Sequence, residues 1–205
     1  HLNVINGILI NSMKVVSDKS KLEKLLYMLE ELQANYSQQE RNPRGQTKEV
    51  RETRMYYLKR KKLNSLSKEI SCLTTDQEIE LAALTIFLNK TCYNGLWRMN
   101  RNGEFNVPEG DYDSPTNICQ EPILRICQQH LISASLSSLA WEDTFRHVRS
   151  GDLVYLDPPY MPLEINGTTF TTNFTDGFSR QDQIQFARKS PQLAAKGARV
   201  IASNH

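Results

Sequence analysis

The chain has 205 residues, with 25 Lys and Arg against 23 Asp and Glu, and its formal net charge of +2 is too small to indicate nucleic-acid binding by itself. No apolar run approaches the roughly 20 residues that a membrane-spanning helix needs, so no membrane association is expected. The four cysteines include no Cys-x-x-Cys pair. Disulfides and a metal site are therefore not expected, and a cytoplasmic location fits best.

The first half of the sequence predicts helices. Leucines at helical spacing after Asp18 predict an amphipathic helix over residues 18–36. A second helix is predicted to reach about residue 70, and residues 41–64 concentrate Lys and Arg. Such a run is usually a solvated helix face, and a surface that faces phosphates is the alternative. Thr75 and Glu78 predict a capping box for a more apolar helix that extends through Leu88.

The stretch NGLWRMNRNGEFNVPEG, residues 94–110, is rich in turn-forming residues and polar groups. Asn–Gly pairs between short segments are typical of hairpin turns, so we predict a β-hairpin at about 93–110. A hairpin this polar is expected to contact another molecule. A loop over 111–117 and a helix from Ile118 to Ile132 are predicted to follow.

The last third of the chain has the pattern of a strand–helix–strand unit. Leu153–Leu156 is a short apolar run, typical of a strand buried on both faces. Ser179 is predicted to begin a helix, with Asp182 at its third position, and Arg199–Ala202 is predicted to be a second strand. This order implies a parallel sheet with helices on its faces, and hence an α/β fold.

The sequence Asp157-Pro158-Pro159-Tyr160 follows the first of these strands. Ligands of open α/β sheets bind beyond the carboxyl ends of the strands. A carboxylate, a neighbouring proline carbonyl and an aromatic ring suit a planar heterocycle that carries an exocyclic amine. The alternative is structural: the prolines end the strand and the aspartate caps a turn.

These motifs resemble those of a known enzyme family. Asp157–Tyr160 after an apolar strand resembles the signature of amino-methylating DNA methyltransferases that use S-adenosylmethionine. The stretch from Phe87 to Gly110 is similar to the Dam-type family, including its DpnII-like restriction-modification members. The similarity extends to Phe170-Thr171, Asp176-Gly177-Phe178, Asp182-Gln183 and Ser203-Asn204-His205.

The resemblance implies a fold and a domain organisation. The expected fold is a partial Rossmann-like methyltransferase sheet with a mostly helical target-recognition insertion that carries the β-hairpin. Residues 1–17 and 118–205 would belong to the catalytic domain, and 18–117 would form the target-recognition domain.

The resemblance also implies an activity: methyl transfer to the N6 amine of a flipped adenine in double-stranded DNA, GATC being the family's usual target. A cognate restriction endonuclease is a candidate partner. The expected catalytic residues are Asp157, Pro158, Pro159 and Tyr160. The expected cofactor contacts are Asp157, Asn3 and Trp141. The expected DNA contacts are Lys90, Tyr93, Asn94, Leu96, Arg98, Asn100 and Pro108, although Leu96 and Pro108 could instead simply pack the hairpin.

Several positions depart from the family pattern. His1 stands where an Asp usually holds the cofactor ribose, and the Gly-rich turn that precedes it in the family is missing. We therefore expect an incomplete form of the enzyme, and a non-catalytic DNA-binding remnant is the alternative function. Asp111 replaces a commonly basic residue beside Glu109, and carboxylates there are expected to repel phosphate. A methyltransferase acting on RNA or on a protein amide would leave the hairpin without a role.

Overall fold

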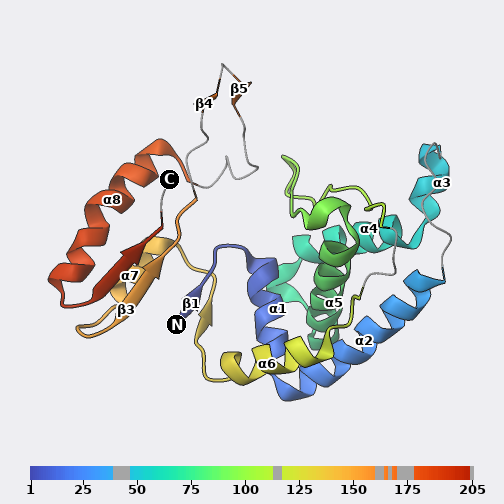
Figure 1. Cartoon of the computed structure of the whole chain (residues 1–205), viewed down its shortest axis with the longest axis horizontal. Coiled ribbons are helices and arrows are strands. Elements are labelled where there is room, and N and C mark those ends of the chain that lie inside the picture. The colour runs from blue at the N-terminus through green and yellow to red at the C-terminus, as the bar shows by residue number, and fades with distance from the viewer. Residues whose placement is uncertain (39–46, 113–116, 160–163, 166–167, 170–177, 204–205) are drawn as a thin grey trace. The chain divides into compact units, whose positions relative to one another are not determined.

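The computed structural model describes residues 1–38, 47–112, 117–159, 164–165, 168–169 and 178–203. The chain forms two compact units, His1–Ser138 and Leu139–His205 (Figure 1). Within the described ranges, no helix is long and apolar enough to cross a membrane.

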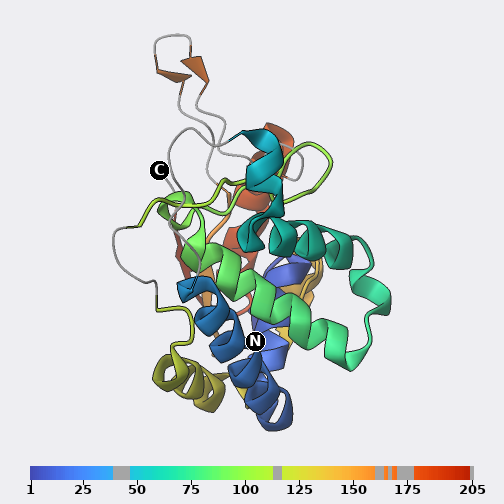
Figure 2. The ribbon, with the colours of Figure 1, turned by 90° about the vertical axis from the view of Figure 1, so that its right-hand side faces the viewer.

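The first unit is helical (Figure 2). Its helices are α1 (Gly7–Ser17), α2 (Lys19–Ser37), α3 (Lys48–Thr53), α4 (Met55–Lys68), α5 (Thr75–Thr91) and α6 (Glu121–Leu131). Its strands β1 (Leu2–Asn3) and β2 (Leu136–Ser137) pair in parallel. Short 3-10 turns cover Ile70–Cys72 and Tyr93–Gly95.

Helix α5 lies at the centre of this unit, packed against α1, α2 and α4. Its buried residues surround the helix rather than forming one stripe, as expected for a helix enclosed by others. Helix α2 contributes the leucines that the sequence predicted, and Leu22, Leu25 and Leu29 are fully buried. The predicted helix over 18–36 is thereby confirmed.

Two local predictions for this unit are wrong in detail. The capping box of α5 joins Thr74 and Gln77, one residue before the predicted pair. The basic segment forms two helices, because Arg54 adopts an extended backbone (φ -68°, ψ 148°) between α3 and α4. The sequence also gave no prediction for α1, which Asn6 caps by accepting from the N–H groups of Ile8 and Leu9.

The second unit contains a parallel strand pair and two helices. Strands β3 (Leu153–Leu156) and β6 (Arg199–Ala202) pair in parallel, with Leu156 opposite Ala202. Helix α8 (Arg180–Ala195) connects them and packs against β6. Helix α7 (Trp141–Arg146) precedes β3, and β4 (Glu164–Ile165) pairs antiparallel with β5 (Thr168–Thr169). The chain is thus a mixed, mainly helical α/β protein with small parallel sheets.

One face of the β3–β6 pair is open. Leu153 and Tyr155 are 68% and 65% exposed, whereas Leu156 is buried beside Leu193 of α8. The prediction that β3 is buried on both faces is therefore wrong. Alternate side chains of a strand point to opposite faces, and in this unit α8 covers only the side of Val154 and Leu156.

The compact units do not coincide with the predicted functional domains. Helix α1 packs against α5 and α6, so residues on both sides of the predicted boundaries at 17 and 118 share one compact unit. The division into a catalytic and a target-recognition domain stays a prediction.

Candidate functional site

Residues 92–110, here called the arm, follow α5 and double back on themselves. Two isolated antiparallel bridges join Cys92 to Glu109 and Met99 to Phe105. Between them the N–H of Asn106 donates to the Arg98 carbonyl (3.1 Å) and the N–H of Tyr93 donates to that of Pro108 (2.9 Å). The arm is looser than the regular hairpin predicted from the sequence.

The tip of the arm is a turn held by Asn100. Its Oδ1 accepts from the N–H groups of Asn102 (2.9 Å) and Glu104 (3.0 Å), and its Nδ2 donates to the Glu104 carboxylate (3.2 Å). Gly103 supplies the positive φ of 71° that the turn requires. Asn100, a predicted DNA contact, is thus engaged by the turn in this structure.

The remaining predicted DNA contacts of the arm lie on its surface. Tyr93 and Leu96 are 52% and 51% exposed, and Asn94, Arg98 and Pro108 are exposed as well. The interior of the arm is filled instead by Trp97, Phe105 and Val107, with the first two rings 4.5 Å apart. Leu96 and Pro108 therefore do not serve as the packing residues of the hairpin. Lys90, in the last turn of α5, is half-buried.

The guanidinium of Arg98 is oriented by its cross-strand neighbour. Its Nε donates to Oδ1 of Asn106 over 2.8 Å. The two residues therefore pair through both backbone and side chain. A guanidinium held at Nε keeps its two terminal nitrogens together as a planar fork, which is the geometry that suits a base edge.

The base of the arm contains a buried ion pair. The Glu109 side chain is 1% exposed and accepts from Arg54 Nε at 2.8 Å, where the Arg54 side chain is 11% exposed. A second Arg54 nitrogen and the Tyr36 hydroxyl donate to its other oxygen, at 3.2 and 3.0 Å. Burial, and then the Glu109 charge, raises the pKa of Tyr36. The expectation that Glu109 repels phosphate is wrong, because its carboxylate is buried and paired.

The basic segment is neither a uniform solvated face nor a uniform phosphate surface. Arg54 and Arg60 point inward and bind the arm. The exposed lysines of α4 form ion pairs with glutamates, namely Lys61 with Glu52, Lys62 with Glu80 and Lys68 with Glu104. These partners could not be predicted from the basic segment itself, because most of them lie far away along the chain.

In the second unit, Asp157 and Ser203 follow the paired ends of β3 and β6. The N–H of Ser203 donates to the Leu156 carbonyl over 2.8 Å, which extends the ladder to the sheet edge. Asp157 is exposed and Pro158 is half-buried at this edge. Tyr160, the fourth predicted catalytic residue, lies outside the described residues, as do motif positions 170–177 and 204–205.

Helix α8 fixes the segment that follows Asp157. Gln183 Nε2 donates to the Pro159 carbonyl over 3.0 Å. The helix begins at Ser179 as predicted, and the structure shows that Ser179 and Asp182 exchange hydrogen bonds as a capping box. These bonds from Ser179 lower the pKa of Asp182. The sequence placed Gln183 in a motif but gave it no role.

A cavity of about 370 Å³ opens beside this sheet edge. Pro158 and Ser203 line it, together with Phe178, which precedes α8, and one face of α8 that includes Phe186. Apolar walls with a few polar groups are typical of small-molecule and base-binding pockets. The Asp157 segment is therefore placed where a planar ligand could be held.

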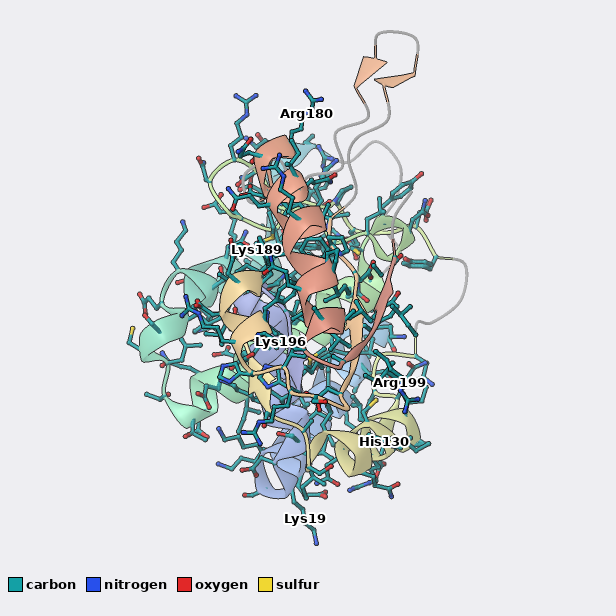
Figure 3. The ribbon with its side chains drawn as sticks, turned by 90° about the vertical axis from the view of Figure 1, so that its left-hand side faces the viewer. Lys19, His130, Arg180, Lys189, Lys196 and Arg199 are labelled. Atoms are coloured by element: carbon teal, nitrogen blue, oxygen red, sulfur yellow. The ribbon has the colours of Figure 1, made fainter. Side chains whose placement is uncertain are left out.

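The two other predicted cofactor residues are engaged elsewhere. The Trp141 ring packs edge-on against Phe145 and Phe186, with centroids 5.2 and 5.3 Å away. Lys189, which projects from α8 in Figure 3, places its ammonium 5.0 Å from the centroid of the Trp141 ring. Asn3 belongs to the first unit, where its Oδ1 accepts from the Ser137 hydroxyl over 2.7 Å.

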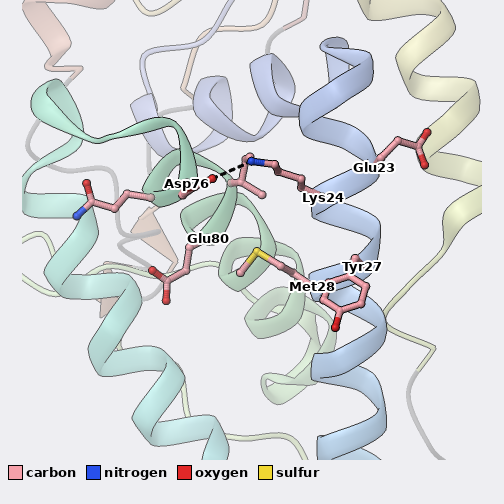
Figure 4. A pocket seen from close by; sticks show the side chains of 8 residues that line it. Glu23, Lys24, Tyr27, Met28, Asp76 and Glu80 are labelled. Carbon is pink, nitrogen blue, oxygen red and sulfur yellow. Dashed lines mark hydrogen bonds and ion pairs between the residues drawn. The ribbon is translucent and has the colours of Figure 1, made fainter.

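A second, larger depression of about 620 Å³ lies between α2 and the start of α5 (Figure 4). Its carboxylates are already paired: Asp76 with Lys24 (3.1 Å), Glu80 with Lys62 (3.4 Å) and Glu23 with Arg125 (2.8 Å). Each carboxylate that lines the depression is thus engaged in an ion pair. Among the described residues, no cluster of three His, Cys, Asp or Glu side chains could hold a metal ion.

A comparison with known protein families identifies the class of protein. The family model of D12 class N6 adenine-specific DNA methyltransferases matches residues 2–205. The chain belongs to this family, and the resemblance found in the sequence is confirmed.

Individual relatives agree with the family match. The chain is 41% identical over 128 residues to the type II methyltransferase M.MjaIII of Methanocaldococcus jannaschii, covering 62% of this chain and 43% of the relative. It is 35% identical over 151 residues to the DNA adenine methylase of Serratia marcescens, covering 73% and 52%. It is 31% identical over 140 residues to the Retron Ec67 DNA adenine methylase of Escherichia coli, covering 68% and 46%. The chain spans about half the length of the curated relatives it matches.

Proposed function

We propose that this chain carries the target-recognition and amine-binding parts of a site-specific DNA adenine-N6 methyltransferase. The observation that carries the proposal is the position of Asp157 and Pro158 at the carboxyl end of β3, beside β6 and the adjoining cavity. Family membership and relatives named as DNA adenine methylases support it. A partial Rossmann-like sheet with a helical recognition insertion is the architecture we infer.

The substrate is an adenine flipped out of the duplex, because its amine is otherwise inaccessible inside the helix. The Asp157 carboxylate and the Pro158 carbonyl would accept hydrogen bonds from the two amine hydrogens, and Tyr160 would stack on the base. Gln183 supports this arrangement by holding the Pro159 carbonyl. Fixing the amine in this way makes its lone pair available along one direction, and orientation of this kind supplies much of the acceleration.

S-adenosylmethionine, when bound, supplies the methyl group. The described residues fit this cofactor only in part. The exposed Asp157 carboxylate suits a cationic sulfonium compound, but the amide of Asn3 is bonded to Ser137 and the Trp141 ring already carries Lys189. A lysine over that ring would also oppose a neighbouring sulfonium charge. We therefore assign no step to Asn3 or Trp141.

The arm would recognise the DNA near the target base. The terminal nitrogens of Arg98 suit a guanine edge, and the exposed Leu96 and Pro108 suit base methyl groups and sugar faces. Tyr93 and Asn94 would occupy the gap that the flipped adenine leaves, since aromatic rings replace lost stacking. Lys90 suits a phosphate. GATC is the target we would test first.

The cellular setting is inferred from the same relatives. One of them is named a type II methyltransferase, which favours a restriction-modification system with a cognate restriction endonuclease. The cytoplasmic location stays a prediction.

Transfer of a tritiated methyl group from S-adenosylmethionine to GATC-containing duplexes tests the proposal. It should be measured with this chain and with the product of its complete reading frame. The variant Asp157→Ala is expected to lose transfer by about 100-fold or more while DNA affinity stays within about 2-fold. Asp152→Asn, at the other end of β3, is the matched control, because Asn keeps an acceptor for the Arg149 N–H.

The outcomes separate the two candidate functions. Methylation that survives in Asp157→Ala would refute the assignment of the amine site. Sequence-selective DNA binding without transfer by either protein would identify a non-catalytic DNA-binding remnant.

A further inference from the structure

Helix α4 presents a stripe of polar side chains along one face. Tyr56, Arg60, Asn64 and Lys68 recur every four residues, so they stand above one another on the helix surface. In the sequence this stripe is hidden within a run of basic residues. We call these four residues the polar stripe.

All four residues of the polar stripe bind the returning half of the arm. The Tyr56 hydroxyl and Arg60 Nη1 both donate to the Val107 carbonyl over 3.0 Å. Lys68 Nζ contacts the Glu104 carboxylate over 2.7 Å. The order of contacts along the arm runs opposite to the order along the helix, so α4 lies antiparallel to this segment (Figure 2).

Asn64 forms two hydrogen bonds with the backbone of a single arm residue, Phe105. Its Oδ1 accepts from the Phe105 N–H over 2.8 Å, and its Nδ2 donates to the Phe105 carbonyl over 3.1 Å. One side-chain amide thus satisfies both polar groups of a residue whose side chain is buried. Phe105 faces Met99 in an isolated bridge, but its own N–H and carbonyl bind Asn64, which therefore takes the place of a neighbouring strand on that side.

The residue after Phe105 connects this contact to the exposed surface. Asn106 binds Arg98 twice, through its N–H to the Arg98 carbonyl and through Oδ1 to Arg98 Nε. A displacement of the backbone at Phe105 would therefore move the Arg98 guanidinium directly. The side chain of Asn64 does not lie on the exposed face of the arm. We therefore expect a substitution of Asn64 to change DNA binding through Asn106 and Arg98.

We propose that the polar stripe is the positioning device of the recognition arm, with Asn64 as its central positioning residue and Asn106 as the connection to Arg98. The inference rests on the proposed function, since it assumes that the arm reads DNA. A bidentate base contact tolerates little displacement, so a loosened stripe should reduce discrimination between sequences more than it reduces overall affinity.

The variant Asn64→Asp tests this directly. It keeps the acceptor for the Phe105 N–H but places an anionic oxygen against the Phe105 carbonyl. Ser65→Asp is the matched control, because it adds the same charge to the next, exposed position of α4. Binding is measured by fluorescence anisotropy, at one salt concentration, to a GATC duplex and to duplexes in which each base pair is changed in turn.

Asn64→Asp is expected to lose about 10-fold in the ratio of affinities for the best and the altered duplexes, whereas Ser65→Asp keeps that ratio. In an Arg98→Ala background the additional effect of Asn64→Asp should disappear. Asn106→Ala leaves the buried contacts of Asn64 in place and should show the same loss of discrimination. It provides the test if Asn64→Asp does not fold. The NMR signal of the Arg98 Nε–H should also broaden or exchange faster in both variants.

Two contrary results are distinguishable. If the unsubstituted chain discriminates between duplexes and both variants discriminate equally well, the stripe has no positioning role and the proposed function stands. If the unsubstituted chain discriminates between none of the duplexes, the sequence-specific function itself fails, and the positioning role fails with it.

Discussion

Glu109→Gln should destabilise the first unit strongly, although it changes only one oxygen to an amide nitrogen. The carboxylate is almost fully buried and accepts from two nitrogens of Arg54 and from the Tyr36 hydroxyl. In the variant, one of the two acceptor atoms becomes a donor that faces another donor. The buried Arg54 guanidinium then loses the anionic carboxylate to which two of its nitrogens donate.

The expected loss follows from removing one partner of this ion pair. Removing one partner of a buried ion pair typically costs about 3–5 kcal/mol, compared with about 0–1 kcal/mol for an exposed pair. Arg54 retains slight solvent contact, since its side chain is 11% exposed. We therefore expect about 3 kcal/mol, a large part of the stability of a small domain. The double variant Arg54→Met with Glu109→Gln removes both members of this ion pair, so it should recover at least about 1 kcal/mol of the lost stability.

The chain has two tryptophans, which permits a separate measurement for each unit. Trp97 lies against Phe105 in the first unit, and Trp141 lies in the second. Urea unfolding monitored by fluorescence in a Trp141→Phe background reports the first unit alone. A loss below about 1 kcal/mol for Glu109→Gln, or a double variant less stable than the single one, would refute the argument from the buried charge.

Two further predictions concern Tyr36 and the start of α8. Burial raises the pKa of Tyr36 above its ordinary value of about 10, so stability should fall as the pH rises above 10, by about 1.4 kcal/mol per pH unit for this group. Tyr36→Phe removes this dependence. The difference in the free energy of unfolding between the unsubstituted chain and this variant should therefore shrink by about 1 kcal/mol between pH 9 and pH 11 in urea unfolding, and a constant difference would contradict the assignment. Ser179→Ala removes the N-cap of α8 and should cost the second unit about 1 kcal/mol, measured by Trp141 fluorescence in a Trp97→Phe background, and an unchanged midpoint would show that the cap contributes nothing.

Local sequence signals predicted the elements that depend on local physics. The leucine spacing of α2, the start of α8 at Ser179 and the strand positions of β3 and β6 all follow from residues near one another in the chain. The capping box of α5 was misplaced by one position because Thr74 and Thr75 are both capping residues, with Gln77 and Glu78 as equivalent partners.

The contacts that shape the candidate site were not predictable in this way. Asn64 and Phe105 are 41 positions apart, and Arg54 and Glu109 are 55 apart. A sequence pattern shows that a residue can form a hydrogen bond but not which distant group it meets. For this reason the basic segment suggested only solvent or phosphate as its partner, and Glu109 suggested repulsion of DNA.

The distribution of polar and apolar groups in the arm argues that it is shaped for a partner. At its base, Glu109 and Arg54 are buried, which costs the desolvation of two charges. On its surface, Tyr93 and Leu96 remain half-exposed, which forfeits about 1–2 kcal/mol of hydrophobic stabilisation for each side chain. Burial of the ion pair and exposure of the two apolar side chains both reduce the stability of the isolated unit. A buried polar base that presents apolar and cationic side chains to solvent is instead what the proposed interface with nucleic acid requires.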